Sequence, residues 1–557
     1  MQETLLALTL VAVTGVTGVC ARILKLHIPM PLLQIAAGII ANLMGLHVGL
    51  DNNLFLLLFI SPLLFVDAYR LPMREFGELK NIIAAMAIGL VIVGTAGGGW
   101  LLHWLIPAIP LAAALALSGA LSPTDAISVA GILRSGRVPP RLLHILRGEA
   151  LLNDASGLVC FKFAVAAATT GLFSLKAASA NFVWVALGGI AIGFTVGFLA
   201  SKIESFLLRK GYDDPSSHSL LALLIPFGIY LIAEHINTSG ILAVVAGGMT
   251  IRLSGIMNET QIETRMRATA IWDMVSFTLN GLVFLLLGLQ LPFLFHDAKA
   301  LMHSSGFSPW TIPLAILTLQ ASMTAIRLLW VITSALIRRI IAKIRHVSCV
   351  VPSWKECVIL ALAGTRGTIT LAAVMSLPAA AEFPDRAIVI IVAAGVIISS
   401  LLLASILLPV MLHLLPASTD ISGSQQELDE TRLSLVRTAI TVLQNEATRH
   451  QNPDDSEPDS LSIAHAQAVP LLLQEYQELQ HTLDRKQSDP GQDHEFSVRN
   501  RRAELAIRLR IVRTQRRKLR ELLLDRKIND ETERVLSRQI DVHEQELMDE
   551  ASALPHV

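Results

Sequence analysis

Residues 148–163 read GEALLNDASGLVCFKF, an apolar run that carries three ionisable side chains, Glu149, Asp154 and Lys162. A charged side chain at the centre of a bilayer costs at least ~2.5–3.5 kcal/mol on insertion scales, so such residues are functional candidates by default. Glu149 and Asn153 are four residues apart and share a helix face, and Asp154 lies next to that face. We therefore expect a functional carboxylate inside a membrane.

The rest of the chain is that of a polytopic membrane protein. It has 557 residues, 53% of them hydrophobic, and a mean hydropathy of +0.56. Its apolar blocks are long enough to cross a hydrocarbon core of about 30 Å. Thirteen candidate spans cover residues 4–24, 29–47, 53–68, 81–106, 111–133, 144–172, 181–208, 217–235, 239–253, 268–292, 311–338, 355–378 and 385–415.

The loops between the spans predict the orientation. Taken alternately, one set of loops holds 19 Lys and Arg residues, whereas the other holds only Lys176, Lys299 and Arg386. Cytoplasmic loops carry the excess of cations. We therefore expect a multi-pass protein of the plasma membrane, with its N-terminus outside and its C-terminal tail in the cytoplasm.

The composition changes after Pro416. Residues 1–416 carry 26 Lys and Arg against 19 Asp and Glu, whereas residues 417–557 carry 19 against 26. Neither part has the basic excess typical of nucleic-acid binding. We predict a transmembrane domain over 1–416 and an α-helical cytoplasmic tail over 417–557. The tail is either regulatory or dimerising, or a solvated pair of helices without activity.

The span at 111–133 is expected to break in the middle of the membrane. Pro123 lacks a backbone donor and disfavours helix at Ser122. Broken backbone survives in a bilayer only where it lines a protein-buried or watery cavity. Thr124 and Asp125 stand at this break, which makes them candidates for a buried site.

A second break is expected in the span at 355–378, where Gly364 and Gly367 bracket Arg366. Glycine weakens a helix and allows close backbone approach. If the first six and the last six spans form two repeats around the seventh, both breaks hold corresponding positions. Interrupted helices at matching positions of two halves point to the binding site of a transporter.

Other charges within the spans are expected to be structural. We interpret Arg327 as a member of a buried ion pair, and Lys162 as a structural charge whose role stays open. The acids near span ends are expected to be solvated at an interface; they are Asp67, Glu234 and Asp273.

Five stretches carry a resemblance to a known family. They are SPLLFVDAYR (61–70), LSPTDAISV (121–129), GEALLNDASG (148–157), SGILAVVAGG (239–248) and GTRGTITLA (364–372). In this order they resemble the monovalent cation–proton antiporters, in the sodium/proton exchanger branch that carries an Asn-Asp pair. The resemblance implies an all-α homodimer with about 13 transmembrane helices in an inverted repeat, in which two crossed, broken helices form the ion site.

The resemblance also implies roles for individual residues. Asp154 would bind cation and proton in turn, with Asn153 as its partner, while Thr124 and Asp125 belong to the unwound helix and complete the cation site. Two further residues, Glu149 and Arg366, resemble the charge pair that braces the site. Many members have Ser where this chain has Ala150, so the cation here would have one ligand fewer or use water.

The implied function is secondary active antiport, not enzymatic catalysis, and no cofactor is implied. One carboxylate can carry either one cation or one proton, so alternating access at Asp154 predicts competitive, electroneutral 1:1 exchange. Na⁺ is the first expectation, with K⁺ or Li⁺ as alternatives, and pH homeostasis as the purpose. A cation channel and a membrane sensor acting through the tail are the competing hypotheses. The sequence shows no repeated acids of a selectivity filter and no kinase or nucleotide-binding motif in the tail.

Overall fold

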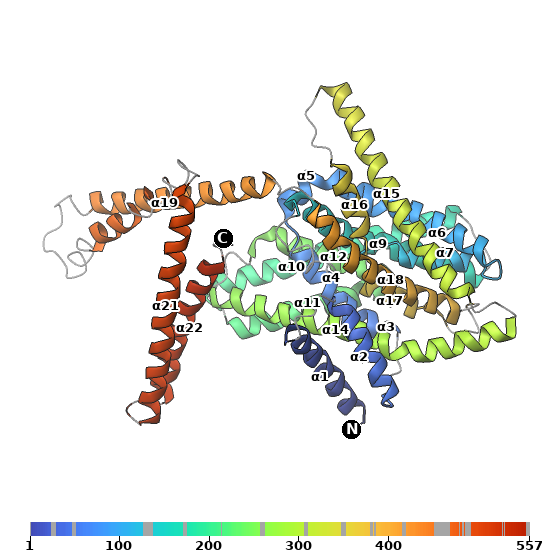
Figure 1. Ribbon diagram of the computed structural model, residues 1–557, viewed down its shortest axis with the longest axis horizontal. Coiled ribbons are helices and arrows are strands. Elements are labelled where there is room, and N and C mark those ends of the chain that lie inside the picture. Colours follow the sequence, from blue (N-terminus) through green and yellow to red (C-terminus); the bar gives the residue numbers. More distant parts are fainter. Residues whose placement is uncertain are drawn as a thin grey trace. The chain divides into compact units, whose positions relative to one another are not determined.

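The computed structural model describes most of the chain. The described residues are 2–23, 29–46, 52–125, 138–170, 175–212, 214–256, 262–305, 310–346, 352–378, 383, 386–414, 419–449, 468–477, 480–481, 484, 492–525, 527 and 530–552. They form two compact units, Met1–Ile421 and Ser422–Val557. The described parts of both units are helical (Figure 1).

The first unit is a bundle of helices, several of them long. Its first part contains α1 (Gln2–Ile23), α2 (Met30–Leu43), α3 (Asn52–Phe55), the π-helical segment η1 (Leu56–Ile60), α4 (Ser61–Tyr69), α5 (Met73–Ala84), the π-helical segment η2 (Ala85–Leu90), α6 (Val91–Leu105) and α7 (Leu111–Leu121). Its second part contains α9 (Pro140–Thr170), α10 (Leu175–Arg209), α11 (Pro215–His235), α12 (Gly240–Ser254), α14 (Ile262–Ser305), α15 (Thr311–Arg345), α16 (Trp354–Leu362), α17 (Thr368–Met375) and α18 (Arg386–His413).

Seven described segments are long and apolar enough to cross a membrane. They are Met73–Leu105, Arg141–Thr169, Val183–Arg209, Pro215–His235, Thr264–Phe293, Thr311–Ile344 and Arg386–His413. Five shorter apolar helices accompany them. Each predicted span overlaps a described helix, although residues 126–133 of the fifth span lie outside the described part. The prediction of an all-helical, multi-span membrane protein is confirmed.

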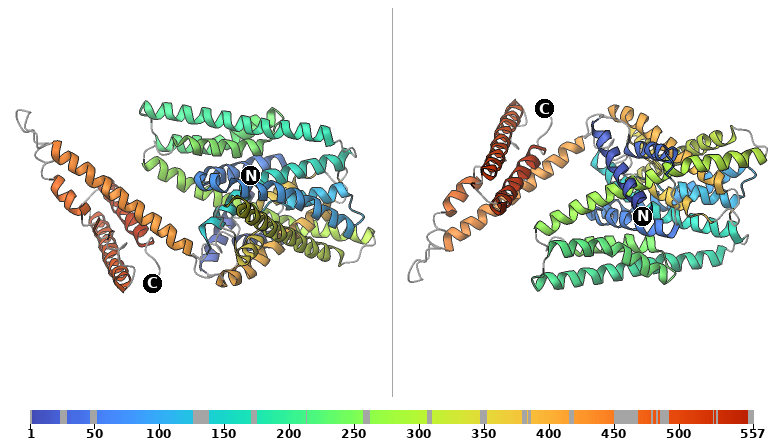
Figure 2. Two further views of the ribbon diagram at one scale, coloured as in Figure 1. Left: turned by 90° about the horizontal axis from the view of Figure 1, so that it is seen from above. Right: turned by 90° about the horizontal axis from the view of Figure 1, so that it is seen from below.

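Small residues allow the helices of the bundle to approach closely. α10 runs along α12, and α2 packs against α14 (Figure 2). Gly193 of α10 faces the backbone of Ala243, and Gly38 of α2 faces Gly288 of α14. Asn42 Nδ2 adds a 2.8 Å hydrogen bond to the Leu289 carbonyl. Close backbone contact and interhelical hydrogen bonds are the main sources of helix association in lipid, where burial of apolar surface adds little.

Local sequence signals fix several helix ends. The Asp214 carboxylate accepts from the Ser217 N–H at 2.8 Å and caps α11, whose first residue is Pro215. α12 begins after the capping residue Ser239 and ends at Gly255, whose φ of 69° suits glycine. Capping side chains satisfy amide groups that the first turn of a helix leaves unpaired. These signals place the loops that join the spans.

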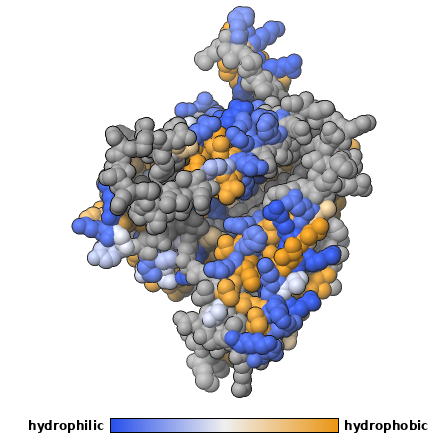
Figure 3. Space-filling view, turned by 90° about the vertical axis from the view of Figure 1, so that its left-hand side faces the viewer, coloured by the Kyte–Doolittle hydropathy of each residue, from blue (hydrophilic) through white to orange (hydrophobic). Residues whose placement is uncertain are grey.

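The second unit contains most of α19 (Thr419–Arg449), which begins just before the unit boundary, and all of α21 (Gln492–Leu524) and α22 (Asp530–Ser552). α21 and α22 pack on a small core of Leu505, Val512 and Leu547. Arg516 pairs with Glu544 at 2.6 Å and also with Asp541. In the space-filling view of Figure 3, hydrophobic patches are interspersed with hydrophilic ones on the coloured part of the surface.

Candidate functional site

Two non-helical segments of the first unit are joined by two hydrogen bonds. α7 ends at Leu121 in front of Pro123, and residues 363–367 separate α16 from α17. The Asp125 N–H donates to the Thr365 carbonyl at 2.8 Å, and the Thr365 hydroxyl donates to the Asp125 carbonyl at 2.8 Å. Each break thus satisfies backbone groups that the other leaves without a helical partner, as a membrane interior requires.

Arg366 supports the same junction. Its Nη1 donates to the carbonyls of Ser122 and Pro123, each at 3.2 Å, and its backbone N–H donates to Ser400 Oγ at 3.1 Å. The proline removes the helical hydrogen bonds that would have occupied carbonyls near the break. Arg366 is 4% exposed. Its buried guanidinium therefore supplies hydrogen bonds to carbonyls that the broken helix leaves without a helical donor.

A chain of buried polar side chains joins the first break to α9. Asn153 Nδ2 donates to Thr124 Oγ1 at 2.8 Å, and Thr124 Oγ1 donates to Glu149 Oε1 at 3.5 Å. Asn153 Oδ1 is buried and has no hydrogen-bond partner among the described residues. A buried, unpaired amide oxygen is rare and calls for an explanation such as a bound ion or water. The orientation of the amide follows from this network.

Glu149 forms a buried ion pair with Arg327 of α15. Both guanidinium Nη atoms reach the carboxylate, and Arg327 Nη2 lies 2.7 Å from Glu149 Oε2. Arg327 Nε also donates to the Leu360 carbonyl at 2.8 Å. Glu149 and Arg327 are 0% and 2% exposed. The interpretation of Arg327 as half of a buried pair is confirmed. The expected pairing of Glu149 with Arg366 is wrong, because Arg366 is held by backbone carbonyls.

Asp154 lies on α9 directly after Asn153 and is half-buried. Three other carboxylates, Asp125, Asp67 and Glu149, are close enough to act on it electrostatically. Asp67 belongs to α4, where the sequence predicted a solvated acid at an interface. The structure brings it instead to the group of Asp125 and Asp154. Only its tertiary position reveals this, since Asp67 stands at the end of an apolar span.

The remaining predicted charges lie away from this group. Asp273 forms an exposed 2.7 Å salt bridge with Arg70. Glu234 is exposed and accepts from the Gly240 N–H at 3.2 Å. Both fit the expectation of solvated acids at span ends. Lys162 is exposed on the outer surface of the bundle, and the structure assigns it no contact with the site.

Glycines allow the two breaks to fit against their neighbours. A Cβ at Gly157 of α9 would overlap the Pro123 ring, and one at Gly367 would overlap the Asp125 side chain. Next to Gly157, Ser156 Oγ donates to the Ala87 carbonyl within the π-helical segment η2. π-helical turns occur frequently at functional sites. The site is therefore held by α9 on one side and by the second break on the other.

These side chains supply oxygen atoms of the kind that hard cations prefer. Candidate donors are the Asp154 and Asp125 carboxylates, the Thr124 hydroxyl and the unpaired Asn153 Oδ1. The charges of the buried Glu149–Arg327 pair compensate each other, and Glu149 also accepts from the Thr124 hydroxyl of this group. All the predicted site residues are therefore in one region, with Arg327 and Asp67 as additions.

Known proteins resemble the chain along most of its length. The family model described as "Sodium/hydrogen exchanger, transmembrane" matches residues 7–414. The "Uncharacterized Na(+)/H(+) exchanger YjcE" of Escherichia coli K12 is 38% identical over 98% of this chain and 99% of its own length. A "Sodium, potassium, lithium and rubidium/H(+) antiporter" of Bacillus pumilus is 35% identical over 95% of this chain and 76% of its own.

A solved structure shares the fold at low sequence identity. The structure of the sodium proton antiporter MjNhaP1 from Methanocaldococcus jannaschii at pH 8 covers 74% of this chain and 99% of its own, with a TM-score of 0.57. The two sequences are 18% identical. At this identity the likeness shows a shared fold alone.

Proposed function

The chain belongs to the sodium/hydrogen exchanger family, whose members are membrane transporters rather than enzymes, and we propose that Asp154 is its exchange site. In this proposal Asp154 binds a monovalent cation or a proton, in turn, as the protein alternates between its two sides. Na⁺ is the first candidate, with K⁺ and Li⁺ as alternatives. The observation that carries the proposal is the neighbour of Asp154, Asn153, whose buried Oδ1 has no described partner.

The oxygen donors around Asp154 support cation binding. Thr124 Oγ1 is fixed by its 2.8 Å contact with Asn153, and Asp125 is fixed by its two hydrogen bonds to Thr365. Positioned oxygen atoms can replace the hydration shell of a hard cation. Asp67 contributes a further negative charge to this group, and we assign it the role of attracting the cation to the site.

The ion pair of Glu149 with Arg327 supports exchange on a single carboxylate. Glu149 is fully buried against a fixed cation, so its charge is already compensated within the protein. Asp154 is then the acid that changes between a cation-bound and a protonated form. In both forms the negative charge of the Asp154 carboxylate is neutralised by one bound positive ion, either the cation or the proton. Exchange is therefore electroneutral and 1:1, and the two ions compete.

We also propose how the helices of the first unit are arranged in the membrane. We assign the first unit to about 13 transmembrane helices in an inverted repeat, with the helices broken at Pro123 and at Gly364–Gly367 crossing at the site. The cation-rich loops favour an outside N-terminus and a cytoplasmic tail in the plasma membrane. A homodimer and a regulatory role for residues 417–557 complete the proposal, with pH homeostasis as the purpose.

The proposal is tested with the purified protein in liposomes that contain a pH-sensitive dye. Na⁺, K⁺ and Li⁺ are added in turn, and Rb⁺ is included because the Bacillus pumilus relative is described as an antiporter of all four ions. We expect cation-dependent proton movement in the wild type and none in Asp154→Asn. Proton movement that needs no added cation would contradict exchange.

A further inference from the structure

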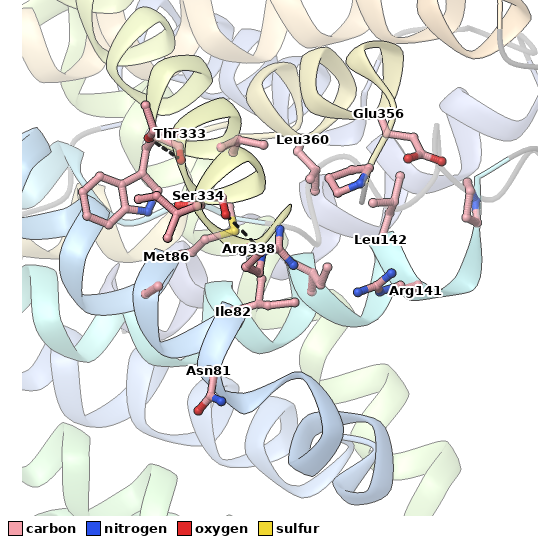
Figure 4. A pocket seen from close by; sticks show the side chains of 17 residues that line it. Asn81, Ile82, Met86, Arg141, Leu142, Thr333, Ser334, Arg338, Glu356 and Leu360 are labelled. Carbon is pink, nitrogen blue, oxygen red and sulfur yellow. Dashed lines mark hydrogen bonds between the residues drawn. The ribbon is translucent and has the colours of Figure 1, made fainter. Parts of the chain in front are cut away.

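A cavity of about 360 Å³ lies in the first unit apart from the Asp154 site (Figure 4). Its walls come from α5, η2, the start of α9, the C-terminal half of α15, and α16 with the segment just before it. Ile82, Met86, Leu142, Val331 and Leu360 supply apolar surface. The volume falls within the ~300–1,000 Å³ range of small-molecule sites, and the largely apolar lining is typical of them.

Two arginines add positive charge to this apolar cavity. Arg141 of α9 and Arg338 of α15 both line it, and Figure 4 shows both side chains at the cavity. Arg338 Nε donates to the Ser334 carbonyl at 3.3 Å, which holds its side chain along α15. Glu356 also lines the cavity, but its carboxylate accepts from the Ser353 N–H at 2.7 Å and closes the capping box of α16. The described lining thus has a net positive charge.

An unpaired donor accompanies the two arginines. Trp330 lines the cavity, and its Nε1 is buried without a hydrogen-bond partner among the described residues. A buried tryptophan N–H normally has an acceptor. The occupant should therefore combine an apolar chain, an acceptor oxygen and a negative charge.

The position of the cavity favours a lipid as this occupant. Arg141 stands in the first turn of α9, and Arg338 lies about two turns before the end of α15 at Arg345. On the orientation given under Proposed function, on which this inference rests, both helix ends lie on the cytoplasmic side. Cationic side chains near helix ends extend towards the membrane interface. Basic pockets between transmembrane helices on the cytoplasmic side are suited to phosphate headgroups.

We propose that this cavity binds one acyl chain of an anionic glycerophospholipid from the cytoplasmic leaflet, with the phosphate held by Arg141 and Arg338. An ester carbonyl of the same lipid would accept from Trp330 Nε1. Lipid chains are as apolar as the cavity wall, so moving a chain from the bilayer into the cavity gives little discrimination. Selectivity therefore resides in the charge of the headgroup. A guanidinium can bind the phosphate through two parallel hydrogen bonds, but a choline headgroup would also bring a quaternary ammonium next to Arg141 and Arg338, and like charges repel.

The cavity lies next to the Glu149–Arg327 ion pair, because both involve Leu360. The Leu360 side chain lines the cavity, while its carbonyl accepts from Arg327 Nε at 2.8 Å. α15 carries Arg327 less than one turn before Trp330. A bound lipid would stabilise the packing of α15 against α16, and hence the folded protein, because a ligand of the native state raises its apparent stability.

The test uses the full-length protein in detergent and does not depend on transport. Phosphatidylglycerol and phosphatidylcholine with identical chains are added separately, and retained lipid is counted by native mass spectrometry beside the shift in Tm. We expect the wild type to retain phosphatidylglycerol about tenfold more than phosphatidylcholine, because the two arginines repel the choline ammonium whereas the glycerol headgroup is uncharged. Tm should rise only with phosphatidylglycerol.

Matched variants locate the binding. Arg141→Gln with Arg338→Gln should remove the preference for phosphatidylglycerol. Arg339→Gln with Lys343→Gln removes the same charge from exposed positions that do not line the cavity, and should retain the preference. Ala85→Phe fills the cavity and keeps both arginines, so it should lose the lipid even if the arginine variants fold poorly.

Three results would overturn the proposal. They are equal retention of both lipids by the wild type, an unchanged preference in both the paired arginine variant and Ala85→Phe, and an equal Tm shift with glycerol phosphate, which lacks the chains. An inactive transporter that still binds phosphatidylglycerol selectively would count against the exchange proposal alone.

Discussion

Asp125 and Thr365, which are 240 residues apart, exchange two hydrogen bonds of 2.8 Å across the two helix breaks. One bond runs from the Asp125 N–H to the Thr365 carbonyl, and the other from the Thr365 hydroxyl to the Asp125 carbonyl. The pair thus fixes the position of both breaks relative to each other. It also places Asp125, and through Thr124 the Asn153 amide, at one point of the bundle.

Thr365→Val tests this link. The change keeps the shape of the side chain but leaves the Asp125 carbonyl without its donor, at a cost of about 1–3 kcal/mol in the free energy of unfolding. We expect a lower Tm and a reduced exchange rate. Thr365→Ser retains the hydroxyl and should stay close to wild type in both measurements. Equal loss in the two variants would contradict the role of the hydroxyl.

The ion pair between Glu149 and Arg327 predicts strong coupling. Removing one partner leaves a buried, uncompensated charge and should destabilise the protein by about 3–5 kcal/mol. Glu149→Ala combined with Arg327→Ala should therefore cost less than the sum of the two single changes, as measured by thermal unfolding. Glu149→Ala combined with Arg366→Ala should be closer to additive, because carbonyl groups hold Arg366. Additive losses for Glu149 with Arg327, and non-additive losses for Glu149 with Arg366, would instead support the pairing of Glu149 with Arg366 that was expected from the sequence.

The two helix breaks could be predicted from the sequence, whereas the partner of Glu149 could not. The breaks near Pro123 and between Gly364 and Gly367 were predictable, because proline and glycine act on the local backbone and leave a signal in the sequence. The partner of Glu149 was not predictable in the same way. Both Arg327 and Arg366 are buried cations far along the chain, and the packing of α15 on α16 decides between them.

The position of Asp67 next to the candidate site could not be predicted from the sequence either. Near the end of an apolar span, an acid is ordinarily solvated, and Asp273 and Glu234 behave in this way. Asp67 differs because α4 packs on α12 and α9, which brings its carboxylate to the group of Asp125 and Asp154. Such proximity has no local signature. Asn153 and Asp154 were predictable because both stand inside an apolar span where polar groups are costly.

The close contact between Gly157 and Pro123 predicts sensitivity to a single methyl group. Gly157→Ala would push a Cβ into the proline ring and displace the first break. Overpacking of this kind costs about 1–3 kcal/mol. We expect a larger loss of exchange than of Tm, because Pro123 lies beside Thr124. Gly228→Ala is the matched control in α11, since its Cβ would meet no atom within 4 Å. A fully active Gly157→Ala protein would show that the break is not held by this contact.

Truncation after Ile421 tests the role of the second unit. The site residues and the family match at residues 7–414 all precede this point. We expect the shortened protein to retain cation–proton exchange in liposomes, with an altered dependence on pH or a changed oligomeric state. The oligomeric state is measured by light scattering. A monodisperse truncated protein without exchange at any pH would make the tail part of the transport machinery.

The central claim is that cation and proton compete for Asp154, and the exchange rate measured against both pH and cation concentration in proteoliposomes tests it most directly. A protonated carboxylate cannot hold a cation, so the apparent KM for the cation should rise as the pH falls, with little loss of rate at saturating cation. Asp154→Asn should fold, because a neutral amide is cheaper to bury than a charge, and should be inactive. A KM that does not change with pH, or exchange by the Asp154→Asn protein, would contradict the account.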